Sequence, residues 1–218
     1  MRIESDLELW LRWHLYRKRK HSKRRGAIYQ FRQCLWSLPK GSVCIDCGAN
    51  VGDVTDLMRR KGLRVIAFEP DSIAIERLRS RFGNDPGVTI IEKAVGASSR
   101  KAMFYQRPGA GGDITQTEGS SLVKKDAHSD GAVAEIDVID LPAFIAGLGE
   151  PVALLKLDIE GAEAELLEAL LDAGLHKRIG QIFVETHERF SPELASRIEA
   201  IRNRIRADNI TNINLDWM

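Results

Sequence analysis

The 218-residue chain contains only three cysteines, Cys34, Cys44 and Cys47, which are too few for a disulfide framework. No apolar run reaches the roughly 20 residues that a membrane-spanning helix needs. The first 20 residues also lack a signal peptide's order of basic, apolar and cleavage-site residues. These absences disfavour secreted disulfide-rich proteins and membrane-spanning proteins, and we expect a cytoplasmic protein in a reducing compartment.

Two common phosphate-binding patterns are also absent. The glycine-rich stretch at 107–122 is not followed by the G-K-[ST] of a P-loop, and the turn at 48–52 lacks the G-x-G of a dinucleotide-binding fingerprint. Cys44-x-x-Cys47 has thioredoxin-like spacing, but these residues lie in a predicted strand and its exit instead of at a helix start. We therefore predict neither a P-loop nor redox chemistry at the cysteines.

The charge of the chain is unevenly distributed. Apolar residues make up 44% and charged residues 29% of the sequence, as in ordinary globular proteins, and the net charge is only +1. Residues 1–40, however, contain 11 Lys/Arg against 3 Asp/Glu, whereas residues 41–218 contain 21 against 28. We predict a basic helical N-terminal extension at 1–40 and one mildly acidic domain at 41–218.

The N-terminal extension contains two helix-like stretches. Residues 4–20 place apolar side chains at helical spacing, and seven strong bases follow among the nine residues 17–25. A second apolar stretch covers 27–38. The basic segment is suited to peripheral contact with an anionic membrane surface or with nucleic acid. The other interpretation is that this extension packs on its own domain, with its bases in solvent. A role in forming a homo-oligomer is also open.

From residue 42 onward, strand-like and helix-like stretches alternate. Strands are predicted at 43–49, 63–70, 88–96, 101–106, 133–140, 152–160, 181–188 and 213–217. Helices are predicted at 51–61, 72–82, 141–148 and 162–173, and another begins near Pro192 with Ser191 as its N-cap. This alternation predicts an α/β fold, with a mostly parallel twisted sheet and helices on both faces.

Acids and one histidine follow several of the predicted strands. The residues at these strand ends are Asp46, Glu69, Asp158, Glu160, Glu185 and His187. In a parallel sheet, ligands bind beyond the carboxyl ends of the strands, near the point where the strand order reverses. One acid at a strand end is ordinary, but acids or histidine at four ends predict a shared polar site.

The stretch VCIDCGANVGDVT, residues 43–55, is typical of a ligand-binding turn between a buried strand and a helix. Its glycines let the backbone approach a ligand closely, and the helix start presents unpaired N–H groups. Glu69, 21 positions after Gly48, is placed to bind a ribose. The carboxylate of Asp46 would repel a pyrophosphate but suits the ammonium and sulfonium of S-adenosylmethionine (SAM). We therefore predict SAM.

The chain resembles the FkbM-type SAM-dependent methyltransferases. The similar stretches, in the family's order, are IDCGANVGDVT (45–55), AFEPD (67–71), KAVG (93–96), GSSL (119–122), KLDIEGAEAELLEAL (156–170) and VETHE (184–188). The resemblance implies a Rossmann-like class I methyltransferase fold and methyl transfer, usually to a hydroxyl oxygen. By position it implies the following cofactor-binding residues: Asp46, Gly48, Asn50 and Gly52 at the methionine end, Glu69 on both ribose hydroxyls, Ala94 and Val95 beside the adenine, and Asp158 beside the methyl donor.

A hydroxyl acceptor must lose its proton as the new bond forms, because its pKa is high. His187 is the side chain best suited by pKa to take that proton, with Asp158, Glu160 and Glu185 nearby in the predicted site. Alternatively, a cation such as Mg²⁺, held by Asp158, Glu160 and Glu185, would lower the pKa of the hydroxyl. A structural role is also open, in which Glu160 and Glu163 cap the following helix.

The leading functional hypothesis is O-methylation of a sugar, glycan, glycolipid or secondary metabolite, with a small-molecule or glycan acceptor as partner. A non-catalytic SAM-binding module or an RNA methyltransferase, either using the basic extension, is the alternative. The acidic domain and the absence of an N/D-P-P-[FYW] stretch disfavour nucleic acid and N-methylation. The loop at 107–122, with Ser120 and Ser121, is a candidate substrate lid. Two antiparallel strands usually end this fold, and here we predict only one, at 213–217.

Overall fold

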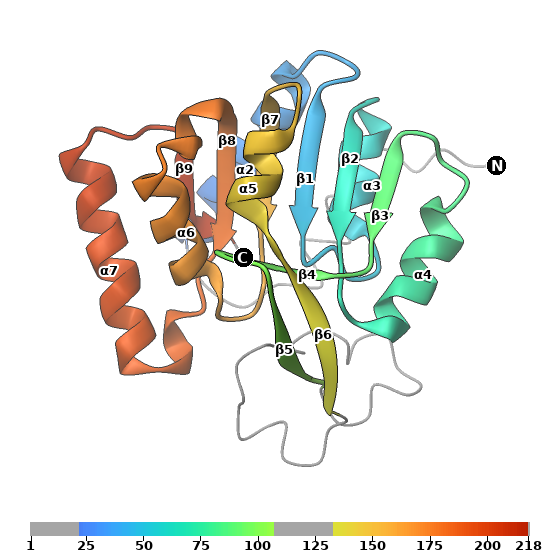
Figure 1. Cartoon of the computed structure of the whole chain (residues 1–218). Coiled ribbons are helices and arrows are strands. Elements are labelled where there is room, and N and C mark those ends of the chain that lie inside the picture. Colours follow the sequence, from blue (N-terminus) through green and yellow to red (C-terminus); the bar gives the residue numbers. More distant parts are fainter. Residues whose placement is uncertain (1–21, 107–132, 218) are drawn as a thin grey trace.

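A computed structural model of the chain describes residues 22–106 and 133–217 (Figure 1). The predicted helix at 4–20 and the predicted lid at 107–122, including Ser120 and Ser121, lie outside these residues. Within them, no helix has the length and apolar character needed to cross a membrane.

Six parallel strands form the main sheet, in the order β3-β2-β1-β7-β8-β9. Their bounds are Val88–Ile91 (β3), Arg64–Phe68 (β2), Val43–Cys47 (β1), Val152–Leu157 (β7), Ile179–Glu185 (β8) and Ile213–Trp217 (β9). The order reverses between β1 and β7, which places a switch point at their carboxyl ends. The predicted α/β fold with a mostly parallel sheet is confirmed, and the last strand pairs parallel to β8.

A second sheet has three strands in the order β4-β6-β5: Ala94–Gly96 (β4), Val133–Asp140 (β6) and Arg100–Tyr105 (β5). The prediction of one strand at 88–96 is therefore wrong, because β3 and β4 belong to different sheets. Glu92 and Lys93 lie between the two strands. Glu92 forms an ion pair with Arg79, and Lys93 forms one with Asp137. In Figure 1 the strands β5 and β6 project past the end of the main sheet toward which its arrows point.

Helices cover both faces of the main sheet. The helices α5 (Leu141–Gly147), α6 (Glu163–Asp172) and α7 (Pro192–Ala207) pack in one apolar cluster, and α2 (Ser22–Ser37), α3 (Asp53–Arg60) and α4 (Ser72–Phe82) pack in the other. Short 3₁₀ helices, Leu175–Arg178 (η3) and Glu188–Phe190 (η4), precede and follow β8. Ser191 is the N-cap of α7, and its hydroxyl accepts the N–H of Leu194 at 3.1 Å, as predicted.

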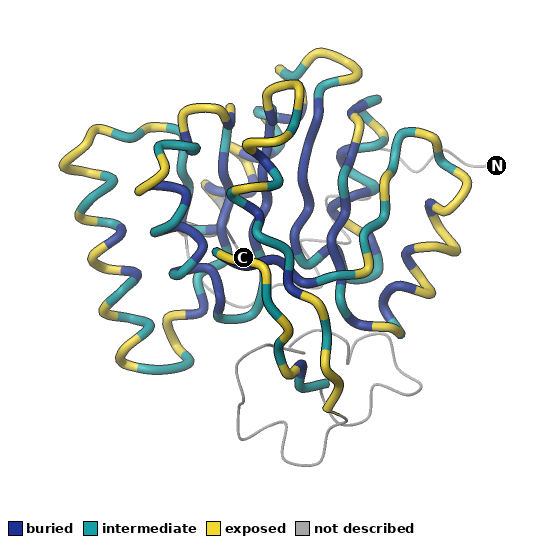
Figure 2. Tube along the Cα trace, in the orientation of Figure 1, coloured by how far each residue is buried: buried dark blue, intermediate teal, exposed yellow. Residues whose placement is uncertain are grey.

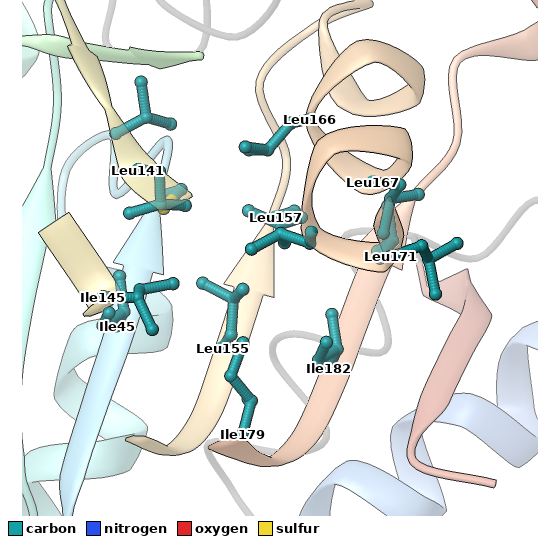
Figure 3. Close-up of a cluster of buried hydrophobic side chains, with 14 of the residues drawn as sticks. Ile45, Leu141, Ile145, Leu155, Leu157, Leu166, Leu167, Leu171, Ile179 and Ile182 are labelled. Atoms are coloured by element: carbon teal, nitrogen blue, oxygen red, sulfur yellow. The ribbon is translucent and has the colours of Figure 1, made fainter. Parts of the chain in front are cut away.

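The central strands are buried on both faces, as expected in a doubly covered parallel sheet (Figure 2). Successive side chains of a strand point to opposite faces, so Ile45 joins one cluster while Cys44 joins the other. In Figure 3, the labelled leucine side chains of β7 and α6 face one another in one apolar cluster.

Helix α2 packs against the same sheet. The ring of Phe31 contacts that of Phe183 edge to face, with centroids 5.2 Å apart, and lies 4.4 Å from the ring of Trp217. Phe31 and Leu35 are both buried. The described part of the predicted N-terminal extension therefore contributes to the core on the β8–β9 side.

Candidate functional site

The turn after β1 has an unusual backbone. Gly48, Asn50 and Gly52 all have positive φ, at 72°, 49° and 88°. A Cβ on Gly48 would lie 1.8 Å from the carbonyl oxygen of Asp158. This turn therefore presses against the end of β7, and only glycine fits at position 48.

Asp46 lies at the switch point and is fully buried. Its Oδ2 accepts a hydrogen bond from the hydroxyl of Thr55 in α3 at 2.7 Å. Its Oδ1 has no hydrogen-bond partner among the described residues, and the nearest cation is the Nζ of Lys156 at 3.4 Å. A buried carboxylate oxygen without a hydrogen bond lowers the stability of the fold. Such an oxygen is an expected feature of a ligand-binding site.

Lys156 joins the two sides of the switch point. It is buried in β7 opposite Asp46, and its Nζ donates to the carbonyl of Gly48 at 2.7 Å. It also lies 3.5 Å from Oδ2 of Asp158. Burial lowers the pKa of Lys156, but the carboxylates of Asp158, Asp46 and Glu185 more than offset this and raise the pKa above its ordinary value. Lys156 is therefore charged at neutral pH.

Lys156 is a site residue that the acids and histidine at the predicted strand ends did not reveal. A signal was present, because lysine is rarely buried without a partner and here interrupts the apolar strand VALLKL. That position predicts a buried counter-charge, and the acids at the ends of β1 and β7 provide it.

Glu69 follows β2 and connects it to the glycine turn. Its Oε2 accepts the backbone N–H of Asn50 at 2.7 Å, and its Oε1 accepts that of Asp71 at 2.8 Å. Burial raises the pKa of Glu69 to about 7, although the two backbone hydrogen bonds oppose the shift. Glu69 thus lies beside the turn after β1, where a ribose-binding acid was expected.

The turn between β7 and α6 is closed by Glu163. Glu160 and Gly161 have positive φ, at 57° and 113°. Oε1 of Glu163 accepts the N–H of Ile159 at 3.0 Å, and Oε2 accepts that of Gly161 at 3.0 Å. Of the two acids considered as caps, Glu163 thus bonds the turn that precedes the helix, and it is fully buried.

His187 follows β8 and is 1% exposed. Its Nδ1 lies 2.8 Å from Oε1 of Glu163. Its Nε2 lies 3.4 Å from Glu160, 3.8 Å from Asp158 and 3.9 Å from Glu185, and forms no hydrogen bond with any described residue. Burial lowers the pKa of His187, whereas Glu163, Glu160 and Asp158 raise it, and the net shift is upward.

We call Asp158, Glu185 and His187 the acid–histidine cluster. One ligand atom from each lies within 4.8 Å of the others. The structure therefore brings together all four residues predicted to be catalytic, Glu160 included. The compact group of ligand atoms contains His187, however, in place of the Glu160 of the all-carboxylate alternative. The side chains of Asp158, Glu160 and Glu185 are 12–21% exposed, whereas that of His187 is only 1% exposed.

Ala94 and Val95 are both buried in β4, and Val95 packs in the apolar cluster with α5 and α6. Their predicted place beside the adenine stays a prediction.

Cys44 and Cys47 are buried in β1, and burial raises the pKa of both thiols, that of Cys44 to about 12. Both thiols are therefore protonated at neutral pH.

Residues 46–209 match the model of the Methyltransferase FkbM domain. The chain belongs to the FkbM methyltransferase family. The matched range begins at Asp46 and includes every site residue described above. The resemblance that the sequence motifs indicated is thereby confirmed.

The chain is also similar to individual proteins. The FkbM chain is 28% identical over 201 residues to the AMB antimetabolite synthetase AmbE of Pseudomonas aeruginosa. The alignment covers 78% of this chain but only 9% of the length of that synthetase. Among solved structures, a TehB-like SAM-dependent methyltransferase from Corynebacterium glutamicum is similar with a TM-score of 0.38 and 12% identity, over 90% of this chain and 80% of that one.

Proposed function

We propose that this FkbM-family protein transfers the methyl group of SAM to a hydroxyl oxygen of a sugar, glycan, glycolipid or secondary metabolite. The observation that supports this best is the arrangement at the switch point. There the ammonium of Lys156 lies between Oδ1 of Asp46, which accepts no hydrogen bond from any described residue, and Asp158 of the acid–histidine cluster. The secondary-metabolite class is further favoured by the similarity to part of an antimetabolite synthetase.

On the cofactor side, Oδ1 of Asp46, which is buried and accepts no hydrogen bond from any described residue, would pair with the ammonium of SAM. The two ribose hydroxyls donate to Glu69, since each of its oxygens accepts one backbone N–H and has a second lone pair. The positive-φ turn at Gly48 and Gly52 lets the backbone lie close to the methionine part. Ala94 and Val95 flank the adenine.

On the acceptor side, the hydroxyl lies between the methyl group and the carboxylates of Asp158 and Glu185, which reach the surface. A lone pair of the hydroxyl oxygen attacks the methyl carbon in line, the C–S bond breaks, and S-adenosylhomocysteine leaves with the electron pair. The hydroxyl proton passes to the cluster as the O–C bond forms.

The test uses SAM with a ¹³C-labelled methyl group and a panel of hydroxylated sugars and metabolites. S-adenosylhomocysteine should accumulate, and the chemical shift of the product carbon should be that of an O-methyl group. Asp158→Asn should abolish transfer, whereas Glu168→Gln, a partly exposed acid on α6 paired with Arg197, should not. Binding of SAM without transfer to any of these acceptors or to an added RNA would support the non-catalytic module instead, and label on the added RNA would support the RNA methyltransferase.

A further inference from the structure

We propose that the acid–histidine cluster, Asp158, Glu185 and His187, is a binding site for one divalent first-row transition metal ion. The site has three protein ligands and leaves coordination positions for water and the acceptor hydroxyl. Binding of the ion follows from the cluster alone, and only its role in methyl transfer rests on the proposed function.

The distances within the cluster suit a shared cation. Nε2 of His187 is 3.8 Å from Oδ1 of Asp158 and 3.9 Å from Oε1 of Glu185. Ligands that are about 2.1 Å from an octahedral ion stand about 3.0 Å apart when adjacent and about 4.2 Å apart when opposite. The three ligand atoms, all within 4.8 Å of one another, therefore need only small side-chain shifts to coordinate one ion.

The orientation of His187 provides independent support. Its Nδ1 is hydrogen-bonded to Glu163, which directs Nε2 toward Asp158, Glu160 and Glu185. That nitrogen is fully buried and has no hydrogen-bond partner among residues 22–106 and 133–217. Histidines that bind metals almost always donate their other ring N–H to a carboxylate or carbonyl. Glu163 is placed for that role.

Charge around the cluster also favours a cation. The carboxyl groups of Asp46, Asp158 and Glu185 surround the ammonium of Lys156, and among the described residues those of Glu160 and Glu163 add to them beside His187. A proton on Nε2 of His187 would supply one compensating charge, but it would point at carboxylates that are not in hydrogen-bond geometry. A divalent ion supplies two charges, and the distances from Nε2 of His187 to the oxygens of Asp158 and Glu185 become distances between ligand atoms around it.

The ligand types indicate which metal. One imidazole with two carboxylates suits Mn²⁺, Fe²⁺ or Zn²⁺, whereas Mg²⁺ and Ca²⁺ prefer oxygen ligands throughout. The histidine therefore separates this site from the all-carboxylate Mg²⁺ site considered above as an alternative to a histidine base. As a Lewis acid beside the methyl donor, the ion would lower the pKa of the acceptor hydroxyl, whose proton would then pass to a neighbouring carboxylate or to solvent.

The test is a titration of chelator-treated, metal-free protein with MnCl₂, in which the electron paramagnetic resonance signal of free aqueous Mn²⁺ is recorded. We expect one site per chain in the wild type and in the control Glu168→Gln. Asp158→Asn and Glu185→Gln should bind at least tenfold more weakly. Coupling of the bound ion to a nitrogen nucleus, measured by pulsed resonance, should be present in the wild type and absent in His187→Asn.

Absence of a Mn²⁺ site in the wild type, or undiminished binding in Asp158→Asn, would overturn the proposal. Circular dichroism of each variant excludes loss of fold as the cause of lost binding. Methyl transfer that persists at full rate in chelator, without a Mn²⁺ site, would overturn the metal inference and leave the proposed function intact. Mn²⁺ binding in a protein that does not bind SAM would support the metal site and contradict the proposed function.

Discussion

Nδ1 of His187 lies 2.8 Å from Oε1 of Glu163, and both side chains are buried. This contact joins the residue that follows β8 to the first residue of α6. The same carboxylate also accepts N–H groups from the turn that contains Glu160. One buried acid thus sets both the shape of the β7–α6 turn and the direction of the imidazole.

Substitution of this acid should separate positioning from cofactor binding. In Glu163→Gln the imidazole loses its charged acceptor, so Mn²⁺ affinity and kcat should each fall about 10–100-fold. Affinity for SAM should stay within about twofold, because the predicted contacts of SAM on β1 and β2 are intact. Glu165→Gln, a partly exposed acid in the same helical turn, is the matched control and should behave as wild type. Equal losses in SAM affinity and kcat would indicate that Glu163 acts only through the fold.

Removal of the buried ammonium should destabilise the protein. Lys156→Met leaves Asp46 and Asp158 without their cation and the carbonyl of Gly48 without its donor. Loss of one partner of a buried ion pair costs about 3–5 kcal/mol, which urea denaturation would measure. Lys93→Met, whose ion pair with Asp137 is exposed, should cost less than about 1 kcal/mol. Equal losses of stability in the two variants would show that the ion pairs of Lys156 do not hold β1 and β7 together.

Binding of S-adenosylhomocysteine should depend on pH through Glu69. The pKa of this carboxyl is raised to about 7 by burial, and ribose hydroxyls donate to its ionised form. Below pH 7 the protonated acid must lose its proton before the ligand binds, so affinity should fall as the pH decreases. Between pH 8 and pH 6 the loss should be about tenfold, because linkage gives up to a factor of ten for each pH unit below the pKa.

The control for this pH effect is Glu69→Gln, in which nothing titrates at position 69. The ligand's own ammonium and the other acids titrate alike in both proteins, so the difference between the two calorimetric profiles isolates Glu69. The same pH dependence in both proteins would contradict the ribose assignment.

Helix α2 should prove to be part of the folded domain. Phe31 is 1% exposed and contacts the rings of Phe183 and Trp217. Phe31→Ala should lower the free energy of unfolding by about 3–5 kcal/mol, as expected for a buried phenylalanine. Tyr29→Ala, on the same helix but 62% exposed, should have little effect. A small loss in Phe31→Ala would mean that α2 docks only loosely.

Much of this fold could be predicted because apolar periodicity depends mainly on local sequence. The helix at 72–82 and the strand at 133–140 were predicted with the observed bounds. The stretch 88–96 was not, since its continuous β-type pattern does not show that Lys93 turns toward Asp137 in another sheet. The pairing of a strand depends on distant residues, which periodicity does not record.

The candidate site was predictable in its members but not in its contacts. The pattern of acids and one histidine after predicted strands identified Asp158, Glu185 and His187, because parallel strands bring their carboxyl ends together. The roles of Lys156 and Glu163 depend on which side chains meet across the β1–β7 and β8–α6 contacts. Those contacts follow from the strand order and from the two positive-φ turns, neither of which the local sequence specifies.

The central claim is that the switch point binds SAM, and titration calorimetry tests it most directly. We predict one SAM per wild-type chain and an affinity at least tenfold lower in Glu69→Ala, because the two ribose hydroxyls would lose a charged acceptor worth about 1.5–3 kcal/mol for each hydrogen bond. Absence of SAM binding in the wild type, or an unchanged affinity in Glu69→Ala, would contradict the account.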